Sequence, residues 1–232
     1  MSICEVVLTN YKRKQNLPQI VEAFRQQNVP VTITLIDNAH PDERVDDATA
    51  KSVDKYFHIF PNPYRCFIRH ACFGFYNAEY ILIHDDDMVP GKRNVEHYLK
   101  YVTPDRILGQ IGRKICPVQG YNFDAIQGTD DLVPVDLVIR SYFFHISTFS
   151  IIHEFKRKLI QSRMGNLLHQ DDMLLAVCRK GNVFVTPQEE GDTRCNIREL
   201  DASSGEYHYP DRQRDRTRTW QLLNSLHSTF IR

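Results

Sequence analysis

The sequence has no surplus of charge, no long apolar run and no closely spaced cysteines. Its 29 basic and 29 acidic side chains cancel, which removes the usual electrostatic basis for binding nucleic acid or an anionic membrane. No segment approaches the roughly 20 apolar residues of a membrane-spanning helix. The N-terminal residues also lack the cationic start and small-residue cleavage site of a signal peptide. We therefore expect a cytoplasmic protein that has no transmembrane segment and does not bind nucleic acid.

The six cysteines are scattered, at Cys4, Cys66, Cys72, Cys116, Cys178 and Cys195. None belongs to a CxxC pair of the kind that zinc sites use, and the chain is not a small, cysteine-dense scaffold held by disulfides. We interpret them as reduced, half-buried thiols with a structural role.

The composition is that of an ordinary globular protein. Of the 232 residues, 42% are hydrophobic and 25% are charged, which excludes a disordered or fibrous chain. The sequence shows no internal repeat, low-complexity segment or linker. We therefore expect one domain over 1–232, with a nucleotide-binding half over about 1–105 and an acceptor half and C-terminal wrap over about 106–232.

Strand-like and helix-like segments alternate along the chain. In the first half, apolar runs and amphipathic spacing predict strands at 5–9, 31–36, 56–60 and 80–84 and helices around 17–24, 45–53 and 67–78. The second half predicts strands at 107–111, 133–139 and 183–185 and helices at 152–160, 171–179 and 220–226. Such alternation is typical of a parallel sheet with right-handed crossovers. We expect an α/β fold with a Rossmann-like, mostly parallel sheet flanked by helices.

Three polar clusters follow predicted strands, at residues 9–13, 37–38 and 85–87. In an open parallel sheet, ligands bind at the carboxyl ends of the strands. Because parallel strands bring these ends to the same edge, we expect the three clusters to converge there.

The triplet Asp85, Asp86 and Asp87 is the strongest single feature. Adjacent carboxylates repel one another unless a cation or solvent relieves them. Mg²⁺ is commonly held by one or two carboxylates together with substrate phosphates, and the alternative is a solvated acidic turn. If side chains keep alternating after the strand, Asp85 and Asp87 point the same way, which favours Asp87, supported by Asp85, at a bound ion.

Five segments carry a shared pattern: residues 6–13 (VVLTNYKR), 34–38 (TLIDN), 80–87 (YILIHDDD), 111–114 (IGRK) and 169–175 (HQDDMLL). In order and spacing they resemble the glycosyltransferases of GT-A fold, in particular the family 2-like and exostosin-like branches. These enzymes transfer a sugar from a nucleotide diphosphate sugar. The resemblance implies a UDP-sugar donor, a glycan or glycolipid acceptor, and Mn²⁺ or Mg²⁺ as cofactor.

The resemblance also implies residue roles in the nucleotide site. The pocket for base and ribose would be lined by Thr9, Tyr11 and Arg13. Asp37 would hydrogen-bond the base, usually uracil, and either Arg65 or Arg69 would meet the nucleotide. Asp85 would touch the ribose and support the metal, and Asp86 would belong to the same nucleotide-sugar site.

Further residues would complete the metal and acceptor sites. Asp87 would hold Mn²⁺ or Mg²⁺ against the diphosphate, and His208 could reach the ion from a C-terminal loop or could lie in a surface turn. Asp171 and Asp172 occupy the family's "ED" position, so one of them would be the general base for the acceptor hydroxyl; the alternative is a helix N-terminus that favours acids. Arg113 would bind the diphosphate or acceptor, or would form a basic surface pair with Lys114.

Three other features have structural interpretations that compete with functional ones. His84 lies in an apolar strand and is interpreted as a core residue. The aromatic run 142–145 is interpreted as core, with sugar stacking as the alternative. The segment 211–218 alternates in charge, so we expect a solvated stretch with local ion pairs, and a loop folding over the diphosphate is the other reading.

Two other function classes remain open. A sugar-nucleotidyltransferase shares the sheet and the metal but usually has a glycine-rich loop after the first strand, and residues 9–15 contain no glycine. A non-catalytic module that binds nucleotide or sugar would need neither the metal nor Asp172. The favoured hypothesis is a metal-dependent hexosyl or pentosyl transferase.

Overall fold

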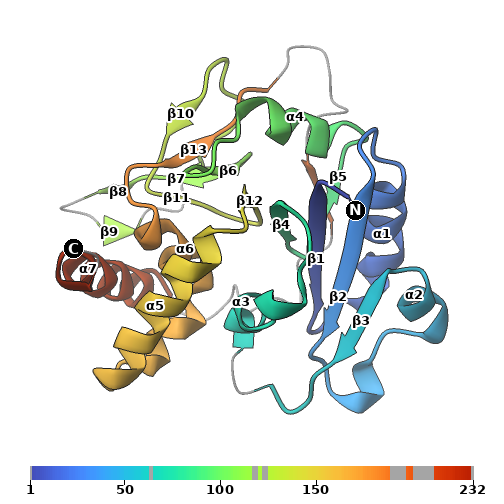
Figure 1. The fold of residues 1–232 in the computed structure, drawn as a ribbon, viewed down its shortest axis with the longest axis horizontal. Helices are drawn as coiled ribbons and strands as arrows, with labels where there is room; N and C mark the ends of the chain where they lie inside the picture. The colour runs from blue at the N-terminus through green and yellow to red at the C-terminus, as the bar shows by residue number, and fades with distance from the viewer. Residues whose placement is uncertain are drawn as a thin grey trace.

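A central eight-stranded sheet organises the molecule (Figure 1). The structure is a computed structural model that describes residues 2–62, 65–116, 120–121, 125–188, 197–200 and 212–230. The strands of the sheet are β1 (Cys4–Asn10), β2 (Val31–Asp37), β3 (Lys55–His58), β4 (Tyr80–His84), β6 (Ile107–Gly109), β10 (Val133–Pro134), β12 (Ser141–His145) and β13 (Val183–Val185). Their spatial order is β10-β13-β6-β12-β4-β1-β2-β3.

The half of the sheet built from the first 84 residues is parallel. β1 lies between β2 and β4 and pairs in parallel with both, and β3 extends the sheet beside β2. β12 lies antiparallel between β4 and β6, and β13 is parallel to β6. The predicted α/β fold with a mostly parallel sheet flanked by helices is confirmed, and β12 is an antiparallel strand within it.

Helices cover both faces of the sheet. The α-helices are α1 (Leu17–Arg25), α2 (Asp47–Lys51), α3 (Ile68–Ala71), α4 (Asn94–Tyr101), α5 (Thr148–Gln161), α6 (Asp171–Cys178) and α7 (Arg212–Phe230). Apolar residues of α1 and α4 pack in one hydrophobic cluster, and those of α3, α5, α6 and α7 pack in another. Figure 1 shows α5, α6 and α7 grouped together, far from α1 and α2.

Alternation along the strands divides side chains between the two clusters. In β4, Leu82 packs with α1 and α4, whereas Ile81 and Ile83 pack with the α5–α7 group. Successive side chains of a strand point to opposite faces, so a strand covered on both sides is apolar throughout. This explains why residues 80–84 form an unbroken apolar run that ends at His84.

Three two-stranded sheets lie outside the main one. They pair β5 (Met88–Pro90) with β14 (Ile197–Glu199), β7 (Gly112–Arg113) with β11 (Leu137–Val138), and β8 (Ile115–Cys116) with β9 (Gly120–Tyr121). The predicted strand over 133–139 is therefore wrong as one element, because β10 pairs with β13 while β11 pairs with β7.

The predicted helix over 67–78 is also broken. The structure has a 3₁₀ turn at Arg65–Phe67, the single turn α3, and a second 3₁₀ turn at Phe73–Phe75. The hydroxyl of Tyr76 donates a 2.6 Å hydrogen bond to the carbonyl oxygen of Arg69. That carbonyl would accept from residue 73 in a continuing helix, so the folded-back tyrosine competes with helix extension.

The C-terminal helix is longer than predicted. α7 begins at Arg212, whereas a helix was expected only over 220–226; residue 211 lies outside the described residues. Within the stretch expected to be solvated, Arg214 and Arg218 are exposed and Arg214 pairs with Asp215, but Arg216 is buried. Arg216, Trp220 and Leu223 are buried at helical spacing, but the surrounding charges hide this periodicity in the sequence. The short helix α4 and the strands β5 and β12 were not predicted.

Several local predictions agree with the structure. Among the described residues, Cys4, Cys66, Cys72, Cys116 and Cys178 form no disulfide bond, and Cys195 lies outside these residues. His84 is fully buried, its Nε2 is 2.9 Å from the carbonyl oxygen of Met88, and burial lowers the pKa of His84 to about 4. Within the described part of the chain, no helix combines the length and the apolar character needed to cross a membrane.

Gly109, at the end of β6, is closely surrounded by other atoms. A Cβ atom there would lie 2.6 Å from Cβ of Val138 and 2.9 Å from the carbonyl oxygen of Ser141. We expect Gly109→Ala to lower the free energy of unfolding by about 1–3 kcal/mol, as overpacking does, measured by urea denaturation. Gly74→Ala is the control, because a Cβ at Gly74 would meet no atom within 4 Å. Equal stability of the two variants would contradict the prediction.

Candidate active site

The three polar clusters converge at the carboxyl edge of the parallel strands. Asn10 at the end of β1 is in register with Asp37 at the end of β2, and Leu8 is in register with His84 of β4. The backbone amide of Asn38 donates to the carbonyl oxygen of Asn10 at 3.0 Å. The parallel topology therefore brings residues 9–13, 37–38 and 85–87 to one edge, as predicted.

The acidic triplet forms a turn after β4. Arg13 Nη1 donates to Asp86 Oδ1 at 2.7 Å and to Asp87 Oδ2 at 3.2 Å, and Asn16 Nδ2 donates to the carbonyl oxygen of Asp86 at 2.9 Å. Asp86 and Asp87 thus share the guanidinium of Arg13, whereas Asp85 contacts Arg69. Regular strand geometry ends at His84, but the charge of Asp87 still acts on Asp85.

Asp85 is joined to the start of α6 by Arg69. The Nη1 atom of Arg69 lies 2.5 Å from Asp85 Oδ1, and its Nε and Nη2 atoms lie 3.1 and 2.8 Å from Asp171 Oδ2. The Arg69 side chain is 6% exposed and the Asp171 side chain 7%. Nε2 of His70 is 3.4 Å from the same Asp171 oxygen. A single buried guanidinium therefore connects the acidic turn with the acidic helix start.

Burial and neighbouring charges shift the pKa values of Asp85, Asp86 and Asp171. Burial raises the pKa of Asp85 to about 7, helped by the charges of Asp87 and Asp171 and opposed by Arg69. Burial also raises the pKa of Asp86, against the charge of Arg13. Burial would raise the pKa of Asp171 as well, but the Arg69 charge and hydrogen bonds from Arg69 and His70 hold it below its usual value. Arg69 and His70 therefore favour the ionised form of Asp171.

Asp172 is paired with the C-terminal helix. Its Oδ2 atom accepts a hydrogen bond from Arg216 Nη2, and its Oδ1 atom accepts from the backbone amide of Met173 at 2.9 Å. Both residues are at least nine-tenths buried. Asp171 and Asp172 are adjacent in sequence, yet each faces a different arginine from a distant part of the chain.

Asp37, the residue predicted to bond the base, is engaged by groups of the protein itself. It is fully buried, and its carboxylate accepts hydrogen bonds from Asn10 Nδ2, Tyr56 Oη and the backbone amides of Ala39 and Val45. Four donors saturate this carboxylate. In this conformation Asp37 therefore orders the loop that follows β2.

The other predicted residues are spread around this edge. Thr9 is half-buried, Tyr11 is 44% exposed and Arg65 is exposed. Arg113 is buried, with its guanidinium carbon 5.9 Å from the ring centre of Tyr121, whereas Lys114 is exposed. His208 lies outside the described residues. Of the two arginines proposed for the nucleotide, Arg69 belongs to the carboxylate network and Arg65 does not.

Asp87 offers the oxygen that a divalent cation would bind. Its Oδ1 atom is buried and has no hydrogen-bond partner, whereas its Oδ2 atom accepts from Arg13. Within the described ranges, no group of three or more His, Cys, Asp or Glu side chains is arranged to hold a metal. The unpartnered Oδ1 atom of Asp87 is the observation that would fit an ion held by one or two carboxylates and completed by phosphate oxygens, a common way of binding Mg²⁺.

Sequence reasoning missed three contributors to the site: Arg216, His70 and Tyr121. Arg216 was assigned to a solvated stretch, although its spacing from Trp220 and Leu223, at i, i+4 and i+7, indicated the buried face of a helix. No sequence signal predicted His70 or Tyr121, because their partners at Asp171 and Arg216 are remote in the chain.

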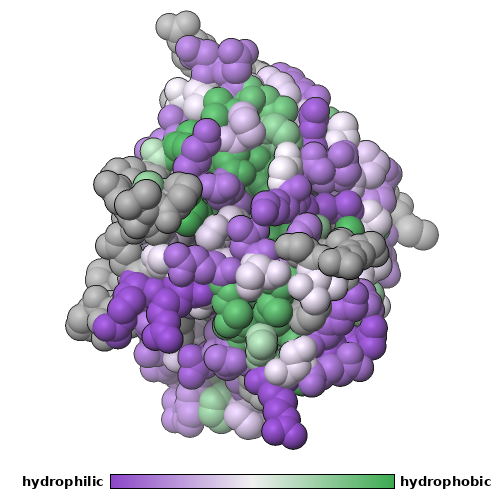
Figure 2. Space-filling view, turned by 90° about the vertical axis from the view of Figure 1, so that its left-hand side faces the viewer, coloured by the Kyte–Doolittle hydropathy of each residue, from purple (hydrophilic) through white to green (hydrophobic). Residues whose placement is uncertain are grey.

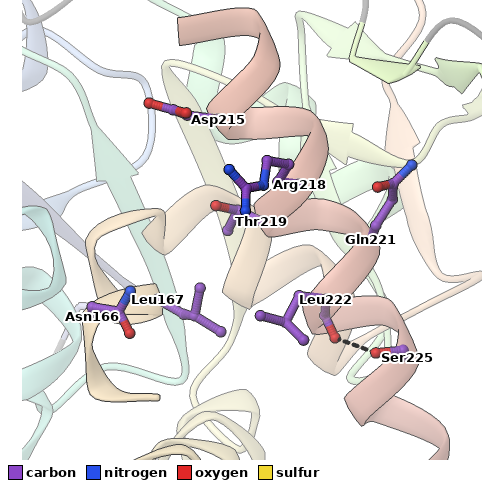
Figure 3. A pocket seen from close by; sticks show the side chains of 8 residues that line it. All are labelled: Asn166, Leu167, Asp215, Arg218, Thr219, Gln221, Leu222 and Ser225. Carbon is purple, nitrogen blue, oxygen red and sulfur yellow. Dashed lines mark hydrogen bonds between the residues drawn. The ribbon is translucent and has the colours of Figure 1, made fainter. Parts of the chain in front are cut away.

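A groove next to α7 lies apart from these carboxylates. It has a volume of about 590 Å³ and is lined by residues of α7 and of the 3₁₀ segment Gly165–His169. Figure 3 shows Leu167 and Leu222 pointing toward each other, with Asn166 beside Leu167. Figure 2 shows that this side of the molecule carries separate hydrophobic areas divided by hydrophilic side chains.

Arg69 and Arg65 form a matched pair for testing the network. Replacing Arg69 leaves the buried carboxylate of Asp171 without its main cation, so we expect Arg69→Met to lower the free energy of unfolding by about 3–5 kcal/mol. Arg65→Met changes an exposed side chain and should have little effect. Urea denaturation of both variants is the measurement, and equal losses would contradict the assigned contacts.

Comparison with known proteins supports the fold. No protein-family profile and no curated protein matches the chain. Among solved structures, TarS 1–349 of S. aureus in complex with UDP-GlcNAc is similar over 96% of this chain and 65% of that chain, with a TM-score of 0.57 and 13% identity. A second S. aureus TarS structure is similar over 82% of this chain and 36% of that chain, with a TM-score of 0.53 and 12% identity.

The chain spans 36% and 65% of the length of these two solved chains. TarS is a glycosyltransferase, and at this level of identity the similarity concerns the arrangement of the chain in space. The protein therefore has the GT-A-like α/β fold of glycosyltransferases.

Proposed function

We propose that this protein is a metal-dependent glycosyltransferase that moves a hexosyl or pentosyl group from a UDP-sugar to a hydroxyl of a glycan or glycolipid acceptor. The observation that carries the proposal is the Asp85–Arg69–Asp171 bridge at the carboxyl edge of the sheet. It joins an acidic turn suited to a metal and diphosphate with a helix start suited to an acceptor, on a GT-A-like fold.

The acidic turn is the proposed donor site. Asp87, supported by Asp85, would hold Mn²⁺ or Mg²⁺, because Asp87 Oδ1 is buried without a partner and oxygen ligands suit these ions. The bound ion would neutralise charge that develops on the diphosphate leaving group. Arg13 already contacts Asp86 and Asp87, so its guanidinium is placed to meet an incoming phosphate. The exposed ring of Tyr11 is the surface proposed for the base.

Asp172 is the proposed acceptor base. Asp171 contacts both Arg69 and His70, so we assign it a positioning role, and this favours Asp172 as the base. In a direct displacement, the acceptor oxygen bonds to the anomeric carbon, the bond from that carbon to the diphosphate breaks, and Asp172 takes the hydroxyl proton. A non-catalytic module would bind UDP without needing Asp172.

Metal-dependent nucleotide binding tests the proposal first. We expect UDP to bind the wild type with Mn²⁺ but not with EDTA, and we expect Asp87→Asn to weaken that binding by about tenfold or more. Asp105→Asn, which changes an exposed carboxylate bonded to Thr103, should bind as the wild type does. Calorimetry with UDP, GDP, CDP and ADP is the measurement. Tighter binding of another base would overturn the UDP assignment, and no binding of any diphosphate would contradict the donor site.

A further inference from the structure

The C-terminal helix α7 is anchored where it passes the candidate active site. Trp220 and Leu223 are 8% and 0% exposed and belong to the hydrophobic cluster that also contains α5 and α6. The hydroxyl oxygen of Thr217 accepts a 2.9 Å hydrogen bond from the backbone amide of Tyr121. Arg216 precedes Trp220 by one helical turn and lies on the same buried face. The contacts of Thr217, Trp220 and Leu223 therefore fix the position of the backbone that carries the Arg216 side chain.

The guanidinium of Arg216 is surrounded by groups that hold it in one orientation. Its Nη2 atom donates to Asp172 Oδ2, and its Nη1 atom donates to Gln170 Oε1 at 2.6 Å. Its central carbon lies 4.5 Å from the ring centre of Tyr121, a distance at which cation–π attraction adds to the ion pair. These contacts arise from the segment just before α6, from α6 itself and from β9.

The guanidinium of Arg216 stays protonated although it is buried. Burial would lower the pKa of Arg216, but the Asp172 carboxylate raises it above its usual value. An ionised arginine therefore faces Asp172 at any ordinary pH. This matters because removing one partner of a buried ion pair leaves the other charge uncompensated.

The same contacts leave Asp172 able to accept a proton. Its Oδ1 atom accepts from the Met173 amide and its Oδ2 atom from Arg216, which occupies one lone pair on each oxygen of a carboxylate that has about four such sites. The plane of the carboxylate is fixed while further lone pairs remain. A general base works best when its accepting lone pair is held toward the proton it takes.

We propose that Arg216 is a positioning residue for Asp172, so that helix α7 is part of the catalytic unit. The proposal rests on the proposed glycosyl transfer and assigns to Arg216 no contact with the donor. Arg216 acts through Asp172, and its loss lowers turnover without weakening nucleotide binding. Lysine keeps the charge but lacks the planar fork that reaches Asp172 and Gln170 together, so it replaces arginine only in part.

The test compares Arg216→Met, Arg216→Lys and Asp172→Asn with the control Arg218→Met, an exposed arginine on the same helix. Two quantities are measured: UDP binding with Mn²⁺ by calorimetry, and kcat and KM for release of UDP from the probe UDP-N-acetylglucosamine by transfer to water. We expect Arg216→Met to lower kcat by about tenfold or more, with KM and UDP affinity unchanged. Arg216→Lys should recover part of kcat, and Arg218→Met should match the wild type.

Coupling between the two side chains gives a second criterion. If Arg216 acts through Asp172, Arg216→Met should lower kcat much less in an Asp172→Asn background than in the wild type. Wild-type kcat in Arg216→Met, or independent effects of the two substitutions, would overturn the proposal. Loss of UDP affinity in step with kcat would also overturn it, because Arg216 would then be a donor ligand.

The two proposals fail in different ways. If the wild type binds UDP with Mn²⁺ and releases UDP from the probe while Arg216→Met does the same, only the role of Arg216 is wrong. If the wild type binds no nucleoside diphosphate, the proposed transfer itself is wrong, and the positioning role falls with it. Far-ultraviolet circular dichroism of each variant shows whether a loss of turnover reflects unfolding.

Discussion

The buried guanidinium of Arg69 is the interaction on which the candidate site depends. It reaches Asp85, in the turn after β4, and Asp171, at the first residue of α6. These carboxylates are separated by 86 residues of chain in the printed numbering, and two like charges so close would repel without the cation between them. The same contact therefore stabilises the fold and sets the relation between the two parts of the site.

Two further arginines, from other segments of the chain, contact the remaining carboxylates of the site. Arg13 follows β1 and faces Asp86 and Asp87, while Arg216 belongs to α7 and faces Asp172. Each carboxylate of the candidate site thus has a cationic neighbour that arrives from another element. Only Asp87 keeps a buried carboxylate oxygen without a partner among these five acids, and that oxygen is the one proposed to bind a metal. Three guanidinium groups thus face five carboxylates.

The parts of this arrangement that could be predicted are those with a local signal. The apolar runs at β1, β2 and β4 gave the parallel strands, and their order placed the polar clusters at one edge. The orientation of Asp86 could not be predicted, because it depends on where strand geometry ends and on a contact with Arg13. Asp37 looked like a ligand-binding acid, yet four internal donors engage it. Arg216 was missed because its partner lies 44 positions away.

The backbone at the end of β4 is held on both edges, because β4 lies between β1 and β12. Both neighbours stay in register with β4 as far as His84, and the amide of Asp85 adds a 2.8 Å hydrogen bond to the carbonyl oxygen of Arg140. A strand paired on both edges opens last in native-state hydrogen exchange. We therefore expect slow exchange where the acidic turn begins, and ligand entry would be accommodated by rotamers of side chains such as Arg13. A donor entering this edge would lose little affinity to the ordering of backbone, since that ordering already exists in the free protein.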